Sequence, residues 1–184
     1  MFNSLIKYLQ NKINYNIMEN IKLKLTNITS DDLELFSLNG IETEGKVVEL
    51  YDGDTCKIIL IVNNILQKFS CRLIGLDTPE MKPSLTKINR DQEIINAHKC
   101  RNRLLQLTTN CNCNIDTTMK KQECQNLINN NKKIIKVKCH EFDKYGRLLV
   151  TLYSSDLTKS INQTLIDETY AKAYDGGTKE QFLY

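Results

Sequence analysis

The middle of the chain contains three successive apolar runs in which β-branched residues predominate. KVVEL at 46–50, TCKIILIV at 55–62 and QKFSCRLIGL at 67–76 are separated by the turn sequences YDGD and NN. Such runs, punctuated by Asp, Gly and Asn, are typical of strands joined by tight turns. The pattern therefore predicts three consecutive β-strands.

A helical periodicity replaces this pattern further along the chain. Apolar residues recur at spacings of three and four at Ile94, Ala97, Cys100, Leu104 and Leu107, which predicts a helix. Residues 132–142 then alternate apolar with polar positions, and RLLVTLY at 147–153 follows, so we expect two more strands. Ser160 and Gln163 have the spacing of a capping box, which predicts a last helix.

This order of elements favours a β-barrel with helices, α+β by element count. Five short strands, a helix between the third and fourth, and a C-terminal helix suit a five-stranded Greek-key barrel of the OB-fold type. The regular alternation of strand and helix that a parallel sheet requires is absent from the pattern. We expect the barrel domain at residues 44–184, after an N-terminal extension at residues 1–43 that is helical or partly disordered.

The N-terminal extension starts with a basic amphipathic pattern. Its first 18 residues contain no Asp or Glu, and apolar residues recur at helical spacing at Phe2, Leu5, Ile6, Leu9 and Ile13. Such a helix would suit a membrane surface or a targeting segment. A locally packed or frayed extension is the interpretation that we favour, because chain termini are often poorly ordered.

Residues 110–131 form a polar, Asn-rich stretch that we interpret as an inserted loop. The insert and the helix before it carry His98, Cys100, Cys111, Cys113 and Cys124. Zinc binding is one interpretation, but the C-x₂-C spacing of a zinc ribbon or finger is missing. Free thiols are therefore favoured over zinc ligands or disulfides. We assign no role to His140, on the exposed side of its strand.

Composition indicates the size of the domain and its cellular compartment but says little about function. The 184 residues are 41% hydrophobic, enough for one domain with an extension, and the net charge of +3 is too small to indicate nucleic acid by itself. No apolar run approaches the length of a membrane span, and the N-terminus lacks the features of a signal peptide. With seven cysteines and no secretory signal, we expect an intracellular, cytoplasmic monomer.

Four short segments carry the residues that could perform chemistry. They supply Asp52 and Asp54 in YDGDTCK, Arg72 in CRL, Asp77, Thr78 and Glu80 in GLDTPE, and Arg147 in DKYGR. Taken singly, each segment has a structural explanation as a turn, a helix start or a hairpin corner. Arg72 raises a separate question, because a guanidinium within an apolar strand is costly unless an anion meets it. That anion could be Asp77, Glu80 or a bound phosphate.

Taken together, these residues indicate metal-assisted hydrolysis of a phosphodiester. Carboxylates from two segments and a main-chain carbonyl make a site of hard oxygen ligands, which suits Ca²⁺. Two guanidiniums can form forked hydrogen bonds to phosphate oxygens and stabilise a transition state that gains negative charge. A further carboxylate can accept a proton from water or position it for attack.

DGDT, R-x₄-DTPE and DKYGR, in this order, resemble the staphylococcal nuclease (thermonuclease) family over roughly residues 45–174. The resemblance implies an OB-fold barrel with helices that hydrolyses DNA and RNA with Ca²⁺. By position, it assigns Asp54, Asp77 and the carbonyl of Thr78 to the metal, with Asp52 as a further acid nearby. Glu80 becomes the general base or the residue that orders water, while Arg72 and Arg147 hold the scissile phosphate.

The resemblance extends less strongly to residues that would contact the rest of the substrate. Lys144 and Tyr145 match positions that contact a terminal phosphate. Tyr174 matches an aromatic residue that stacks on a base only if a gap of one residue is allowed, and packing at a helix end is an equally good interpretation.

Two functions fit this resemblance. One is an active Ca²⁺-dependent nuclease with little sequence preference, for which DNA and RNA suit the residues equally well. The other is an inactive module of the same fold that binds nucleic acid or protein. Because such a module would have no need for the acidic residues and arginines, their presence here favours the enzyme.

Overall fold

The computed structural model describes residues 2–156, 158–177 and 182. The chain divides into two compact units, Met1–Phe36 and Ser37–Tyr184. The first contains helix α1, Phe2–Asn27, and the 3-10 turn η1, Ser30–Asp32. Helix α1 extends beyond the acid-free first 18 residues, and its apolar side chains Ile6, Leu9 and Ile13 are exposed.

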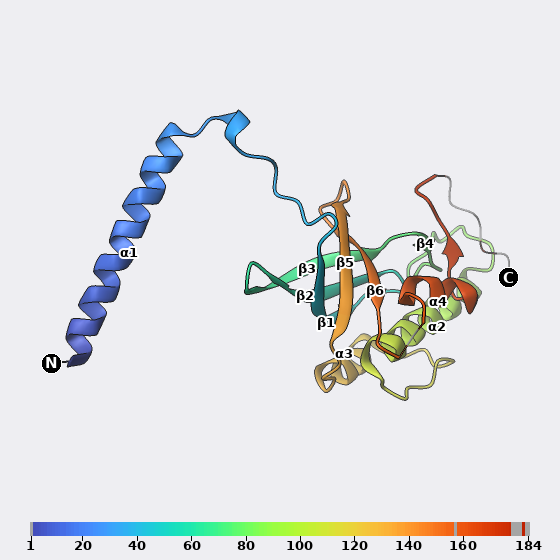
Figure 1. The fold of residues 1–184 in the computed structure, drawn as a ribbon. Coiled ribbons are helices and arrows are strands. Elements are labelled where there is room, and N and C mark those ends of the chain that lie inside the picture. The colour runs from blue at the N-terminus through green and yellow to red at the C-terminus, as the bar shows by residue number, and fades with distance from the viewer. Residues whose placement is uncertain (1, 157, 178–181, 183–184) are drawn as a thin grey trace. The chain divides into compact units, whose positions relative to one another are not determined.

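The second unit is built on a closed barrel of five strands (Figure 1). These are β1 Glu42–Leu50, β2 Thr55–Val62, β3 Ile65–Leu73, β5 Ile135–Phe142 and β6 Leu148–Tyr153. Their order around the barrel is β1-β2-β3-β6-β5, and β5 pairs with β1 to close it. All neighbours are antiparallel except β3 and β6, which run parallel. The predicted five-stranded OB-type barrel is confirmed.

Alternation of side chains produces the barrel core. Strand β2 turns Cys56, Ile58 and Leu60 inward, and the residues between them lie closer to the surface. Strand β1 passes close to β2 at Gly45, where a Cβ atom would lie 2.6 Å from Cδ2 of Leu60. Only glycine permits this approach without displacing the core.

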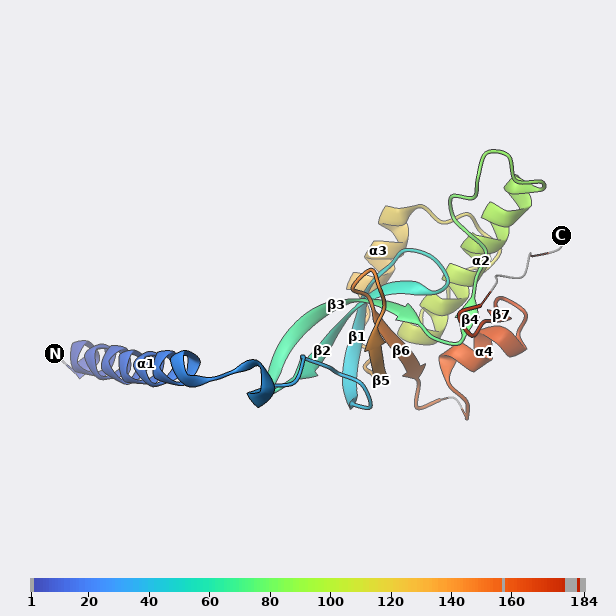
Figure 2. The same cartoon turned by 90° about the horizontal axis from the view of Figure 1, so that it is seen from above.

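Helices α2 Arg90–Thr109, α3 Lys121–Asn129 and α4 Ile161–Asp167 lie together beside one end of the barrel (Figures 1 and 2). The expected stripe of α2 packs inward, with Cys100 and Leu104 in the same core as the barrel residues. Oγ of Ser160 accepts a hydrogen bond from the main-chain N–H of Gln163 at 3.1 Å, so Ser160 caps α4 as predicted.

The interpretation of residues 110–131 as a loop was wrong for Lys121–Asn129, which form α3. Cys124 and Ile128, four residues apart, share one face of this helix and are buried in the core. Gln125 fixes the helix to the barrel by donating a hydrogen bond from Nε2 to the carbonyl of Val48 at 2.8 Å. The numerous Asn and Gln residues concealed this short apolar stripe.

Two short strands attach the chain after β3 to the chain after α4. Strand β4, Leu76–Asp77, pairs antiparallel with β7, Lys172–Ala173. Asn162 strengthens this region, because its buried Nδ2 donates to the carbonyls of Ile74 at 2.9 Å and Val150 at 3.1 Å. The path of the chain through β4 is thus fixed on both sides.

Across the residues that the structure describes, no helix is both long enough and apolar enough to span a membrane.

Candidate active site

The loop between β1 and β2 brings two buried aspartates to one edge of the barrel. Oδ1 of Asp52 accepts hydrogen bonds from the main-chain N–H groups of Asp54 at 3.1 Å and Thr55 at 2.8 Å, which holds the loop in an Asx turn. Gly53 between the aspartates lies so close to Cys100 that a Cβ atom would overlap its Sγ. Packing against α2 therefore requires glycine at position 53, and the turn depends on the side chain of Asp52.

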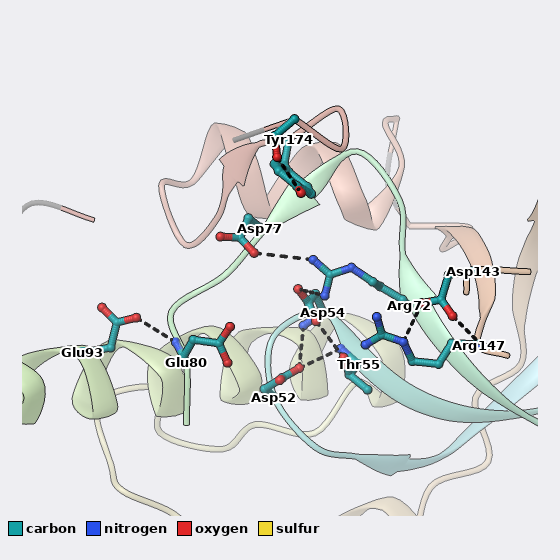
Figure 3. A network of polar contacts seen from close by, with 11 residues as sticks. Asp52, Asp54, Thr55, Arg72, Asp77, Glu80, Glu93, Asp143, Arg147 and Tyr174 are labelled. Atoms are coloured by element: carbon teal, nitrogen blue, oxygen red, sulfur yellow. Dashed lines mark hydrogen bonds and ion pairs between the residues drawn. The ribbon is translucent and has the colours of Figure 1, made fainter. Parts of the chain in front are cut away.

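Arg72 connects this loop with β4. Its Nη1 lies 2.6 Å from Oδ2 of Asp54, and its Nη2 lies 3.5 Å from Oδ1 of Asp77 (Figure 3). The two carboxylates that the sequence assigns to a metal ion therefore converge on one guanidinium. Asp77 is thus one of the partners predicted for Arg72, beside Glu80 and a bound phosphate. Asp54 is a partner that was not predicted.

The segment after β4 places the next predicted residues. Thr78 is buried, and Glu80 lies two residues beyond it in an irregular stretch that leads to α2. The main-chain N–H of Glu80 donates a hydrogen bond to Oε1 of Glu93 at 2.9 Å. Glu93 lies in the first turn of α2, so the helix holds the main chain at Glu80 (Figure 3).

The turn between β5 and β6 supplies Arg147 and is organised by Asp143. Oδ1 of Asp143 accepts hydrogen bonds from the main-chain N–H groups of Tyr145 and Arg147, both at 2.9 Å. Oδ2 accepts one from Nε of Arg147 at 2.7 Å, which fixes the guanidinium. Gly146 has a φ of +76°, a conformation that favours glycine. The sequence analysis missed Asp143, although it is the first residue of the DKYGR motif.

Burial by itself raises the pKa of the Asp143 carboxyl, but the hydrogen bonds from Arg147 and Tyr145 outweigh it and lower the pKa below its usual value. Asp52 is shifted the other way. Burial, followed by the negative charge of Asp54, raises the pKa of Asp52 to about 7. The raised pKa therefore reflects first the burial of Asp52 and then its position beside Asp54.

The predicted residues lie around two adjoining hollows. A cleft of 480 Å³ is lined by Tyr51, Asp52, Asp54, Thr55, Arg72, Thr78, Glu80, Lys144, Tyr145, Arg147 and Tyr174. Asp77 lies in the neighbouring hollow of 750 Å³, which shares Arg72 and Tyr174 with the cleft. The cleft thus gathers residues from all four segments predicted to carry chemistry, together with Tyr174.

Lys144, Tyr145 and Tyr174 line the same cleft. Tyr145 is 72% exposed, and two cations lie over its ring, with Nζ of Lys144 at 5.2 Å and Cζ of Arg147 at 5.6 Å from its centroid. Tyr174 directly follows β7. Its hydroxyl donates to the carbonyl of Gly177 at 3.0 Å, and its main-chain N–H donates to the carbonyl of Gly75 at 3.0 Å.

The cysteines and the histidine of the insert and α2, considered above as zinc ligands, have the following environments. All seven cysteines are free thiols, and burial followed by a contact with Cys111 raises the pKa of Cys113 to about 12. Nδ1 of His98 lies 3.1 Å from Nη2 of Arg101. Within the described part of the chain, no group of three or more His, Cys, Asp or Glu side chains is arranged to hold a metal ion. His140 lies 3.0 Å from Oγ1 of Thr151.

Comparison with known families agrees with this geometry. The family described as staphylococcal nuclease homologue matches residues 70–183, which is well over half of the chain. The chain belongs to the staphylococcal nuclease family. The match begins inside β3, but Asp52 and Asp54 before it lie in the barrel that the matched strands complete. No curated protein matches the chain at a significant level.

Proposed function

We propose that the protein is a Ca²⁺-dependent nuclease that hydrolyses phosphodiester bonds of DNA, RNA or both with little sequence preference. The observation that carries this proposal is the single cleft lined by Arg72, Arg147, Glu80 and Asp54. An inactive binding module would not require two guanidiniums and a carboxylate around the same space. Membership of the nuclease family supports the same function.

The donor atoms present fit a Ca²⁺ ion. Oxygen ligands suit this hard cation, and the carboxylates of Asp54 and Asp77 both contact the guanidinium of Arg72. The ion would be held by two carboxylates, those of Asp54 and Asp77, and by the main-chain carbonyl of Thr78. When bound, Ca²⁺ would supply positive charge that polarises a phosphate oxygen.

Arg72 and Arg147 would bind the scissile phosphate from two elements. Each guanidinium can donate two parallel hydrogen bonds to phosphate oxygens, which fixes orientation as well as charge. Asp143 holds Nε of Arg147, so this guanidinium is oriented before substrate arrives. As negative charge accumulates on the phosphoryl oxygens during attack, both arginines would stabilise the transition state.

Glu80 would act on the attacking water. Its carboxylate accepts a proton while the water oxygen forms a bond to phosphorus, and the phosphorus–oxygen ester bond breaks. The leaving oxygen then takes up a proton from solvent. Lys144, Tyr145 and Tyr174 would contact the parts of the substrate next to the cleaved bond, where an aromatic ring can stack on any base.

Cleavage assays test the proposed function directly. Purified protein is incubated with labelled single- and double-stranded DNA and RNA, in Ca²⁺ or in excess chelator. We expect cleavage in Ca²⁺ that chelator abolishes. A Glu80→Gln variant purified in the same way controls for contaminating nucleases. Binding without cleavage by the wild-type protein would identify a binding module and refute the enzyme.

A further inference from the structure

Glu93, in the first turn of α2, is a carboxylate residue with 1% of its surface exposed. It lies on the side of the helix that contacts the main chain of Glu80. Burying a charged group is costly unless hydrogen bonds and an opposite charge compensate for it. Here Oε1 accepts a hydrogen bond from the N–H of Glu80 at 2.9 Å and lies 2.8 Å from Nζ of Lys87. The first turn of a helix also favours a negative charge.

The contact reaches across an irregular stretch of chain. Neither Glu80 nor Lys87 lies in a helix or strand, and α2 begins at Arg90. Regular hydrogen bonding therefore does not fix Glu80, whereas Glu93 belongs to a long helix packed on the barrel. Figure 3 shows the carboxylate of Glu93 directed at the main chain of Glu80, whose own side chain extends on the other side.

We propose that Glu93 is a positioning residue for Glu80, and that Lys87 balances the charge of Glu93. This inference rests on the proposed nuclease function. Glu93 would not touch substrate or water. It would hold the main-chain nitrogen of Glu80, and with it the Cα atom from which the side chain reaches the cleft.

Such a contact has a large effect because the geometry of a general base is exacting. A displacement of about 1 Å in a reacting group can cost on the order of 10²-fold in rate. A hydrogen bond to a carboxylate is shorter and stronger than one to a neutral acceptor, so Glu93 suits this task better than a main-chain carbonyl would.

The test compares Glu93→Ala and Glu93→Gln with Asp91→Asn. Asp91 lies in the same first turn of α2, but its side chain is 97% exposed, so it controls for the loss of a negative charge at the helix start. Initial rates are measured over a range of oligonucleotide concentrations in saturating Ca²⁺, with circular dichroism as a check of folding.

We expect Glu93→Ala to lower kcat by about 10- to 100-fold, as is usual when a partner that orients an active-site residue is removed. The KM should change little, because Glu93 does not contact the substrate. Glu93→Gln should recover most of kcat, since the amide oxygen can accept the same hydrogen bond. Asp91→Asn should match the wild-type protein.

Three results would overturn the proposal: a wild-type kcat in folded Glu93→Ala, equal damage in the Ala and Gln variants, or equal damage in Asp91→Asn.

If Glu93→Ala does not fold, the Gln variant and Lys87→Met carry the test. Lys87→Met keeps the hydrogen bond from Glu80 and should retain most of kcat. Loss of most of kcat in Lys87→Met, or a Gln variant with little activity, would then contradict the proposal.

A measurement without catalysis separates this inference from the proposed function. Hydrogen exchange of the Glu80 amide, followed by NMR, should be faster in Glu93→Ala than in the wild-type protein and unchanged in Asp91→Asn. Unchanged exchange in Glu93→Ala would refute the contact even in an active enzyme. A wild-type protein that cleaves nothing would refute the nuclease function, whereas faster exchange would still support the contact.

Discussion

Nη1 of Arg72, near the end of β3, lies 2.6 Å from Oδ2 of Asp54, in the loop before β2. The contact follows from the pairing of β2 with β3, whose register places Thr55 opposite Arg72. It means that a residue proposed to bind phosphate already contacts a residue proposed to bind Ca²⁺. Binding of either ligand would therefore change the environment of the other.

Glu80→Gln should remove most cleavage and leave nucleic-acid binding largely intact. The amide keeps the shape of the side chain but cannot accept a proton, and a positioned base contributes about 10²- to 10⁴-fold in rate. Single-turnover cleavage and fluorescence anisotropy measure the two properties separately. Glu123→Gln, on the exposed first turn of α3, is the matched control. Cleavage at the wild-type rate by the Glu80 variant would refute its assignment.

Arg72→Lys should also lose activity, although the charge is kept. Lysine lacks the planar fork that holds two phosphate oxygens, and loss of one such donor costs about 10²- to 10³-fold. Cleavage rate and thermal midpoint are measured together, because Arg72 also contacts Asp54 and Asp77.

Arg103→Lys provides the comparison for Arg72. Arg103 forms a forked contact with Glu168 at 2.6 and 2.7 Å, outside the residues of the cleft. We expect a small change in thermal midpoint and unchanged cleavage. If Arg72→Lys cleaves within a few-fold of the wild-type rate, Arg72 has a structural role as the partner of its carboxylates.

Asp143→Asn should reduce cleavage by on the order of 10-fold, the equivalent of about 1.5 kcal/mol for one charged hydrogen bond. The amide oxygen can still accept from the N–H groups of Tyr145 and Arg147, but an amide nitrogen replaces the oxygen that accepts from Nε of Arg147, and it cannot accept that hydrogen bond. Asp156→Asn, an ion-paired aspartate outside the cleft, is the control. Equal activity of the two variants would contradict the role of Asp143.

The stability of the same variant should depend on pH in a defined direction. The pKa of Asp143 is lowered from 3.8 in the folded protein, so ionised Asp143 stabilises the fold above pH 3.8. This contribution is lost as the pH falls through the lower, folded pKa. Urea unfolding should therefore show a wild-type advantage over Asp143→Asn at pH 6 that shrinks below about pH 4. An advantage that grows on acidification would show that the charge is not what stabilises the turn.

Ca²⁺ and nucleotide should strengthen each other's binding. Asp54, Asp77 and the carbonyl of Thr78 provide half or fewer of the about six to eight oxygens that Ca²⁺ prefers, so water must complete the shell in the free protein. A phosphate oxygen can replace one water. We expect weak Ca²⁺ binding alone and tighter binding with a nucleotide bisphosphate, and by linkage the nucleotide must gain the same factor.

Calorimetric titration of each ligand, with and without the other, measures this coupling. Mg²⁺ should bind but support poor turnover, because it requires a tighter octahedral shell and releases water slowly. An uncleavable oligonucleotide serves as a second phosphate ligand. Equal affinities in the presence and absence of the partner ligand would mean that metal and phosphate do not share a site.

The five barrel strands, their order along the chain and the segments that carry the candidate chemistry are predictable from the sequence alone, whereas the short strands β4 and β7 were not predicted. TCKIILIV at 55–62 was predicted as a strand and is β2, and the cap at Ser160 was read from two residues. These features are local, because alternation, turn composition and capping depend on residues a few positions apart. The motif order also indicated the family before any distance was known.

Which groups meet depends on how the chain packs in three dimensions. Helix α3 is stabilised because Cys124 and Ile128 are buried in the core, whereas the composition of this segment alone suggested a loop. The convergence of Asp54 and Asp77 on Arg72, and the hold of Glu93 on Glu80, depend on barrel closure and on the packing of α2. Such contacts join residues distant in the chain, and their strength depends on how much water folding removes, which no local pattern encodes.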